Sequence, residues 1–268
     1  MRLTLSALGA ALLFPALAAA QTLPPLPSLY ETPAERNARR AAMPPPELQE
    51  DEQLQAVLGS EARPSADSAR DGARHPFETL TFWGLRPRQT IVEIEPGSGG
   101  WWRHILEPYA AATGGTYVPV DRPAAGLGVA DGTADLVVVA RAFHNWAQDG
   151  RTAPYMAAFY KALKPGGVLA VEQHRSEEGL NVAETAPTGY VSESYVIHAA
   201  QAAGFTLEAR SELNANPLDD HHHPFGVWTL PPTRRSEQDG RTLTVGERAA
   251  ADAVGESDRM TLRFRKPE

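Results

Sequence analysis

The chain has 268 residues, a formal net charge of −8 and no cysteine. The absence of cysteine excludes disulfide bonds and thiolate metal sites. No cluster of lysine and arginine is interleaved with aromatic residues, so we expect no nucleic-acid partner. The length is enough for one domain with a substantial apolar core.

The first segment, residues 1–20, has the composition of a signal peptide. Arg2 gives a positive start, residues 3–17 are mostly apolar, and three alanines precede Gln21 as a small-residue cleavage site. The apolar run is too short for a stable membrane anchor, so we predict cleavage and export, into the periplasm or out of the cell. An uncleaved anchor is the alternative.

A proline-rich arm with short helices is predicted over residues 21–62, with one helix near Ala34–Ala42 and another over Glu47–Leu58. Residues 63–268 are predicted to form one domain. Within it, residues 214–258 form a long polar excursion, of which the part from Arg234 to Asp258 is predicted to be exposed and mobile.

From residue 90 onward, apolar strands alternate with amphipathic helices. The predicted elements are strands at 90–95, 116–120, 135–140 and 168–173, and helices at 100–112, from 154, and from 192 to 203. The unbroken apolar run Leu136–Val139 is typical of a sheet covered on both faces. Residues 205–209 and 260–265 alternate with period two and predict two antiparallel strands. The pattern therefore favours an α/β fold with a mostly parallel sheet.

The turn after the first predicted strand is the most informative segment. It reads Glu93-Ile94-Glu95-Pro96-Gly97-Ser98-Gly99-Gly100. Glycine has no side chain, so backbone N–H groups in such a turn can approach a ligand closely. Asp121 ends the next predicted strand, where an acid can bond a ribose hydroxyl pair. Together they predict a nucleoside-containing cofactor above the ends of a parallel sheet.

Further motifs follow in a fixed order after this turn. They are Asp135-Leu136-Val137, Phe143-His144-Asn145, Leu163-Lys164-Pro165-Gly166-Gly167, Ala203-Gly204-Phe205 and Leu262–Pro267, preceded by Arg74-His75-Pro76. With the glycine-rich turn, this set resembles the class I S-adenosylmethionine-dependent methyltransferases, and in particular an exported bacterial group described as predicted methyltransferases. The resemblance spans residues 63–268.

The resemblance implies a three-layer Rossmann-like fold with an antiparallel last strand, and S-adenosylmethionine as the cofactor. Glu93 and the turn of Gly97, Ser98, Gly99 and Gly100 would then lie near the amino-acid portion of the cofactor, and Asp121 would bond its ribose hydroxyls. The G-x-G spacing favours this cofactor over a dinucleotide.

Two departures from the family pattern have structural consequences. Glu95 stands where most members have the first glycine of the turn, so its carboxylate either pairs with the cofactor's positive charge or obstructs binding; we favour pairing. Only thirteen residues separate Asp121 from Asp135, whereas the usual fold places a helix and an edge strand there. We therefore expect these elements to be shortened or missing, with the pocket open on that side or covered by another element.

Candidate catalytic residues follow two of the predicted strands. His144 could act as a base and Asn145 could orient an acceptor, while Glu172 and His174 are expected on one side of the next strand end, at the same rim. The alternatives are that His144 packs beneath the following helix and that the second pair forms a solvated strand end with local ion pairs.

Asp219–His223 is a conspicuous cluster of carboxylates and imidazoles, which are suitable ligands for zinc, nickel or copper. Asp220, His221 and His223 are the candidate ligands, although adjacent residues rarely converge on one ion, so we predict no metal. The cluster could instead be a solvated loop, or Asp220 and His221 could line the substrate pocket.

The best interpretation of the sequence is an exported S-adenosylmethionine-dependent methyltransferase that acts on a small molecule or an exposed surface group. The alternatives are a non-catalytic Rossmann-like ligand-binding module and a metal-dependent protein using the Asp219–His223 cluster. The sequence specifies neither the acceptor nor the oligomeric state. Export would separate the enzyme from the cytoplasm, where the cofactor is made.

Overall fold

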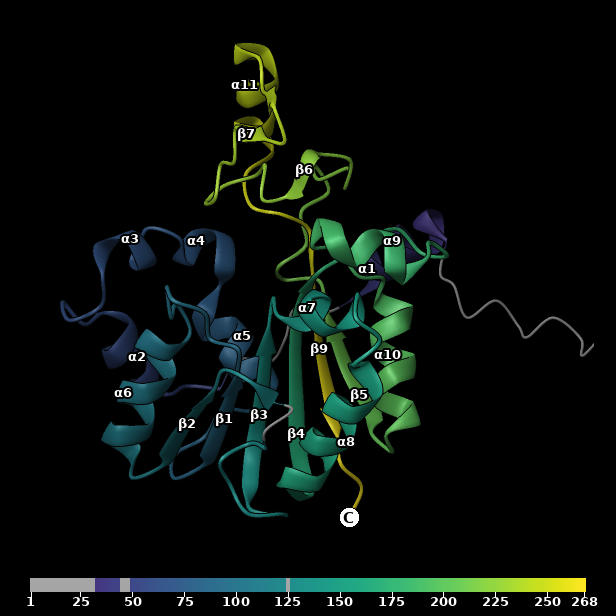
Figure 1. Cartoon of the computed structure of the whole chain (residues 1–268). Helices are drawn as coiled ribbons and strands as arrows, with labels where there is room; N and C mark the ends of the chain where they lie inside the picture. The colour runs from purple at the N-terminus through teal and green to yellow at the C-terminus, as the bar shows by residue number, and fades with distance from the viewer. Residues whose placement is uncertain (1–31, 44–48, 124–125) are drawn as a thin grey trace, which may run out of the picture.

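The computed structural model describes residues 32–43, 49–123 and 126–268 (Figure 1). The predicted signal peptide and the first part of the arm lie outside these residues. No helix in the described ranges has the length and apolar character needed to cross a membrane.

A six-stranded sheet forms the centre of the molecule, in the order β2-β1-β3-β4-β9-β5 (Figure 1). Its strands are β1 (Thr90–Ile94), β2 (Thr116–Val120), β3 (Ala134–Ala140), β4 (Leu163–His174), β5 (Thr206–Ser211) and β9 (Arg259–Arg265). The pairs β1/β2, β1/β3 and β3/β4 are parallel, whereas β9 is antiparallel to both β4 and β5. This topology confirms the predicted Rossmann-like α/β fold with an antiparallel last strand.

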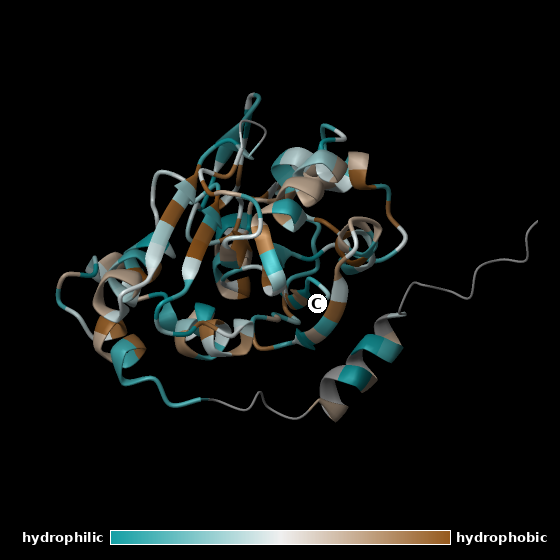
Figure 2. Cartoon of the chain, turned by 90° about the horizontal axis from the view of Figure 1, so that it is seen from below, coloured by the Kyte–Doolittle hydropathy of each residue, from teal (hydrophilic) through white to brown (hydrophobic). Residues whose placement is uncertain are grey.

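Helices cover both faces of the sheet and make two apolar cores. One core involves α2 (Glu52–Leu58), α5 (Pro76–Trp83) and α6 (Arg103–Thr113), and the other involves α7 (Phe143–Ala147), α8 (Thr152–Ala162) and α10 (Glu193–Ala202). Successive strand residues point to opposite faces, so Ile91 joins the first core, and Val92 and Ile94 join the second. Figure 2 shows apolar residues gathered on the strands in the middle of the molecule.

The segments before the sheet are short helices. They are α1 (Pro33–Ala42), α3 (Ser65–Ser68) and α4 (Asp71–Arg74). His75 separates α4 from α5 with a left-handed backbone (φ 44°) before Pro76, because a proline interrupts the helix there. Helix α1 is attached to the domain through Arg39, whose Nη1 lies 2.7 Å from an oxygen of Glu212.

The link between β2 and β3 is short, as predicted. Its described residues, 121–123 and 126–133, contain neither a strand nor an α-helix.

Strand β4 begins at Leu163, five residues earlier than expected, because Leu163 pairs with Ala134 across an irregularity in the register. The sequence Pro165-Gly166-Gly167 therefore lies inside a bulged strand.

The segment between β5 and β9 is more ordered than predicted. It contains β6 (Pro224–Val227), the hairpin of β7 (Glu237–Gln238) and β8 (Arg241–Thr242), and α11 (Val245–Val254), while α9 (Val182–Thr185) and the 3₁₀ helix η2 (Ala186–Thr188) lie before α10. Figure 1 shows α11 and the hairpin beyond β6, away from the sheet. The prediction that exposure extends to Asp258 is wrong, because Ser257 and Asp258 are buried where the chain enters β9.

Candidate functional site

A cavity of about 300 Å³ lies where β1, β3 and β4 end, with the loop after β6 on its other side. Ligands of open α/β sheets bind beyond the carboxyl ends of the strands, so this is the expected place for a site. A larger cavity, of about 700 Å³, lies near Gly84, Lys164 and Gly166, at the opposite end of the strands. We therefore take the smaller cavity as part of the candidate site.

The glycine-rich turn reaches this cavity with its backbone. Gly99 and Gly100 contribute to the lining, and Ser98 between Gly97 and Gly99 is exposed. A Cβ atom added to Gly97 or Gly99 would meet no other atom within 4 Å. Gly97 also has a φ of 69°, which side chains rarely adopt. The turn thus offers open space beside an accessible backbone, as the sequence predicted.

Glu95 and Asp121 lie at the tips of adjacent parallel strands. Ile94 is in register with Val120, and the backbone N–H of Glu95 donates to the carbonyl of Val120 at 2.8 Å. Burial raises the pKa of Glu95, against the lowering effect of a hydrogen bond from Asn145, and the charge of Asp121 raises it further. Neither carboxylate lines the 300 Å³ cavity, so the structure places the acids beside the glycine turn but outside that cavity.

Glu93 is buried beneath the turn, with 2% of its surface exposed. The hydroxyl of Tyr117 donates to Glu93 Oε2 at 2.7 Å. Burial raises the pKa of Glu93 to about 7, although the bond from Tyr117 works in the opposite direction. Glu93 therefore bonds a neighbouring strand and does not line the cavity.

His144 and His174 both line the cavity, and their ring centres are 6.1 Å apart. Burial lowers the pKa of His144 to about 4, so its imidazole is neutral at pH 7. Gln173 Nε2 lies 2.8 Å from the carbonyl oxygen of Gly189, which fixes it as a donor, and 3.4 Å from His144 Nδ1. His144 Nδ1 is thus the acceptor, and Nε2 carries the hydrogen. This tautomer suits a hydrogen-bond donor better than the predicted base.

His174 has a different environment on the same cavity. Its Nδ1 lies 2.6 Å from the hydroxyl oxygen of Ser257, which reaches the cavity from the end of the excursion. Burial holds the pKa of His174 well below its ordinary value, and the charges of Arg141 and Arg259 act in the same direction. His174 is therefore a second neutral imidazole on the cavity.

Glu172 does not lie at the rim, which corrects the prediction. It is completely buried in the sheet, where its Oε1 lies 2.8 Å from Arg259 Nε and its Oε2 accepts from Trp102 Nε1 at 3.3 Å. Both carboxylate oxygens therefore have partners away from the cavity. Asn145 also differs in position, because its amide bonds Glu95 and does not line the cavity.

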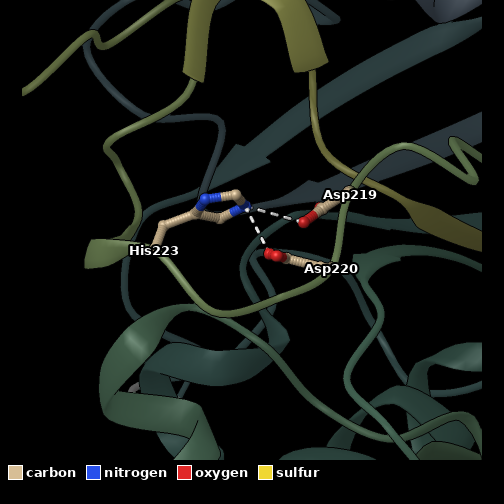
Figure 3. A group of neighbouring side chains, drawn as sticks. All are labelled: Asp219, Asp220 and His223. Atoms are coloured by element: carbon tan, nitrogen blue, oxygen red, sulfur yellow. Dashed lines mark hydrogen bonds and ion pairs between the residues drawn. The ribbon is translucent and has the colours of Figure 1, made fainter. Parts of the chain in front are cut away.

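His223 joins the candidate ligands to one another: its Nε2 hydrogen-bonds Asp219 and lies 3.8 Å from Asp220 (Figure 3). Ligand atoms of Asp219, Asp220 and His223 lie within 4.8 Å of one another. The carboxylate of Asp219 accepts from His223 Nε2 at 2.8 Å, from the hydroxyl of Tyr190 at 3.1 Å, and from the backbone N–H groups of residues 221 and 258.

These bonds occupy the atoms that an ion would need. Burial favours a higher pKa for Asp219, but the bonds from His223 and the two backbone N–H groups outweigh it and lower the pKa. His221 lies apart from the cluster, with its Nε2 3.6 Å from Asp258 Oδ2. The Asp219 cluster is thus a structural tie within the loop, and we assign no metal to it.

Several cavity residues were not predicted from the sequence. They are Asp67, Arg70, Arg74, Trp101, Arg141, Trp228 and Glu256. They come from segments far apart in the chain. Arg74 belongs to the quoted motif Arg74-His75-Pro76, but that motif gives no sign of a cavity. One signal accompanies Arg141 in the structure: its backbone is left-handed (φ 57°), a conformation that is costly for arginine and is often found at functional sites.

No protein-family model matches the chain, and no curated protein matches it in sequence. Distantly similar solved structures include a SAM-dependent methyltransferase from Aquifex aeolicus, which is 13% identical with a TM-score of 0.45 and covers 81% of this chain and 100% of its own. The cyclopropane synthase MmaA2 from Mycobacterium tuberculosis is 16% identical, with a TM-score of 0.41 and coverage of 81% and 94%.

Phosphoethanolamine N-methyltransferase 2 from Haemonchus contortus, solved with S-adenosyl-L-methionine, is 14% identical, with a TM-score of 0.42 and coverage of 81% and 60%. At these identities the likeness concerns the fold and assigns neither ligand nor reaction to this chain.

Proposed function

We propose that this protein is an S-adenosylmethionine-dependent methyltransferase. The observation that carries the proposal is the position of Glu95 and Asp121 at adjacent strand tips, beside a glycine turn whose backbone faces open space. S-adenosylmethionine has a positive sulfonium, an ammonium group and a ribose diol. A pair of carboxylates next to accessible N–H groups suits each of these features.

The residues present fit this cofactor at three positions. Gly97 and Gly99 leave room for its amino-acid portion, Asp121 is exposed and free to accept from two hydroxyls, and Glu95 offers a negative charge near the sulfonium. When bound, the cofactor would supply an electrophilic methyl group. The protein's own contribution is to hold and orient the acceptor, which we place in the 300 Å³ cavity against His144 and His174.

Isothermal titration of the full chain with S-adenosylmethionine and S-adenosylhomocysteine tests this proposal. We expect binding of both, and Asp121→Ala should weaken it at least tenfold because the diol loses its acceptor. Asp131→Ala is the matched control, since Asp131 is an exposed acid of the same loop that pairs with Lys161 at 3.2 Å. No binding at millimolar cofactor would overturn the proposal.

A non-catalytic ligand-binding module is the second candidate, and one observation favours it. Glu95 Oε2 already accepts from Asn145 at 2.7 Å, and the described residues of the β2–β3 link supply no strand or α-helix to enclose an adenine ring. Such a module would bind another ligand in the cavity and would fail to bind S-adenosylmethionine, so the same titration separates the two candidates.

We also propose that the protein is exported, on the basis of the composition of residues 1–20. Fractionation of expressing cells, followed by N-terminal sequencing, tests this. The expected mature protein begins at Gln21 and lies outside the cytoplasm. A cytoplasmic chain that retains Arg2 would contradict export without affecting the proposed reaction.

A further inference from the structure

The 300 Å³ cavity has an excess of positive charge. Arg70, Arg74 and Arg141 line it together with two acids, Asp67 and Glu256. Asp67 is already engaged, because its Oδ2 lies 2.6 Å from Nδ1 of His104. The charges of the three arginines are therefore compensated mainly by Glu256 and by acids behind the cavity wall.

Glu256 is shared among three guanidinium groups. Its oxygens lie 2.8 Å from Arg70 Nε, 3.0 Å from Arg74 Nε and 2.7 Å from Arg259 Nη1. Arg259 in turn pairs with the buried Glu172 at 2.8 Å. Glu256 alone cannot neutralise both Arg70 and Arg74, since Arg259 also takes part of its charge.

Arg141 has the weakest compensation of the three. Its Nη1 lies 3.7 Å from Glu172 Oε2, which is longer than a hydrogen bond, and Glu172 is already bound by Arg259. Around the cavity, Arg70, Arg74, Arg141 and Arg259 thus face three carboxylates, those of Asp67, Glu172 and Glu256.

Each of the three arginines that line the cavity has a buried guanidinium nitrogen without a hydrogen-bond partner among the described residues. These nitrogens are Arg70 Nη2, Arg74 Nη1 and Arg141 Nη1. Arg74 is only 4% exposed, and its guanidinium also stacks over the ring of Trp101 at 4.7 Å. A buried donor or charge without a partner is costly, so such groups are normally satisfied by a ligand or a counter-charge.

We propose that this cavity binds a small oxyanion, a carboxylate or phosphate, carried by the methyl acceptor. Arginine forms paired hydrogen bonds with both kinds of group, and the rings of Trp101 and Trp228 offer an apolar wall for the rest of a small molecule. The identification of the ligand as the acceptor rests on the proposed methyltransferase function. The existence of the anion site does not.

Titration of the full chain with benzoate and with inorganic phosphate, in a buffer free of other carboxylates and phosphates, tests the site. Tryptophan fluorescence can report binding because Trp101 and Trp228 line the cavity. We expect saturable binding of at least one anion, and at least tenfold weaker binding of benzamide, the neutral analogue of benzoate. Preference between the two anions assigns the group as carboxylate or phosphate.

Arg141→Gln and Arg70→Gln should each weaken anion binding about tenfold or more. Arg103→Gln is the control, because Arg103 is exposed and pairs with Glu107 on the helix surface. Arg70 has a side chain 22% exposed, so its variant should fold even if Arg141→Gln does not. Equal binding of benzoate and benzamide, no binding of either anion, or unchanged affinity in a folded variant would overturn the proposal.

Competition identifies the source of the anionic group. If S-adenosylmethionine displaces the anion but 5′-methylthioadenosine does not, the arginines hold the carboxylate of the cofactor itself, and the acceptor assignment is overturned. Simultaneous binding of cofactor and anion supports the assignment of the anionic group to the methyl acceptor. Anion binding without cofactor binding leaves the site intact and rejects the methyltransferase function, so the two failures are distinguishable.

Discussion

Asn145 donates a hydrogen bond of 2.7 Å to Glu95, which ties the end of β1 to the short helix after β3. Glu95 has a left-handed backbone (φ 50°), a conformation in which residues other than glycine are strained. Strain of this kind persists only where the surrounding structure holds it. The bond from Asn145 helps to hold Glu95 in this conformation.

Glu95→Gln tests the charge of this residue while keeping an oxygen for Asn145. If Glu95 pairs with the sulfonium, the variant should bind S-adenosylmethionine roughly tenfold more weakly, about 1.4 kcal/mol. S-adenosylhomocysteine lacks the sulfonium charge and should be affected less. Titration calorimetry of both ligands gives the comparison. Tighter binding by Glu95→Gly would show that the carboxylate obstructs the pocket.

Glu93 should make the fold less stable as the pH rises. Its folded pKa is about 7, and an unfolded glutamate has 4.5. Between these values the folded state holds a proton that the unfolded state has lost, so the free energy of unfolding decreases with pH and levels off above 7. The total effect is about 3 kcal/mol.

Glu93→Gln removes this dependence and leaves an oxygen for Tyr117. We expect the variant to be more stable than the natural chain at pH 8 and nearly equal to it at pH 5, measured by urea unfolding. A stability difference that is the same at both pH values would show that Glu93 does not titrate in this range.

The sequence predicted the sheet and the glycine turn because their signals are local. Apolar runs of strand length and glycines at fixed spacing depend on few neighbours in the chain. Helix α11 also has a local signal, the capping box of Thr244 and Glu247, so it could have been predicted.

The errors concern groups whose environment is set by distant segments. Glu172 was expected at the rim, but its partner Arg259 lies on the antiparallel β9, and the pairing of β4 with β9 decides its burial. The arginine-lined cavity was missed for the same reason. Arg70, Arg141 and Glu256 come from three segments that no periodicity connects.

His144 should remain neutral to well below pH 6. Its pKa is about 4 because it is buried, whereas an unfolded histidine titrates near 6.5. Between these values the unfolded state binds a proton that the folded state does not, so the free energy of unfolding decreases as the pH falls from 6.5 to 4.

Nitrogen-15 NMR of labelled histidines tests this, and it should show the Nε2–H tautomer without protonation from pH 8 to pH 5. Gln173→Glu should raise the pKa by placing a carboxylate beside Nδ1; protonation of the natural chain near pH 6.5 would contradict the burial argument.

Asp219 should be required for stability, whereas its neighbour Asp220 should not. Asp219 is 4% exposed and accepts from Tyr190, His223 and two backbone N–H groups, all of which lose their acceptor in Asp219→Ala. We expect this variant to lose about 3 kcal/mol of unfolding free energy. Asp220→Ala should change it by less than about 0.5 kcal/mol, because that side chain is 73% exposed.

Metal analysis of the same proteins after exhaustive dialysis separates the tie from a metal site. If the cluster only connects the loop, the natural chain should hold no stoichiometric metal, and added zinc should leave its unfolding midpoint unchanged. A bound ion would instead raise the midpoint in proportion to the logarithm of zinc concentration, and Asp220→Ala would abolish that rise. Because Asp220 contributes little to the hydrogen bonds within the loop, Asp220→Ala changes the unfolding midpoint only if the cluster binds zinc.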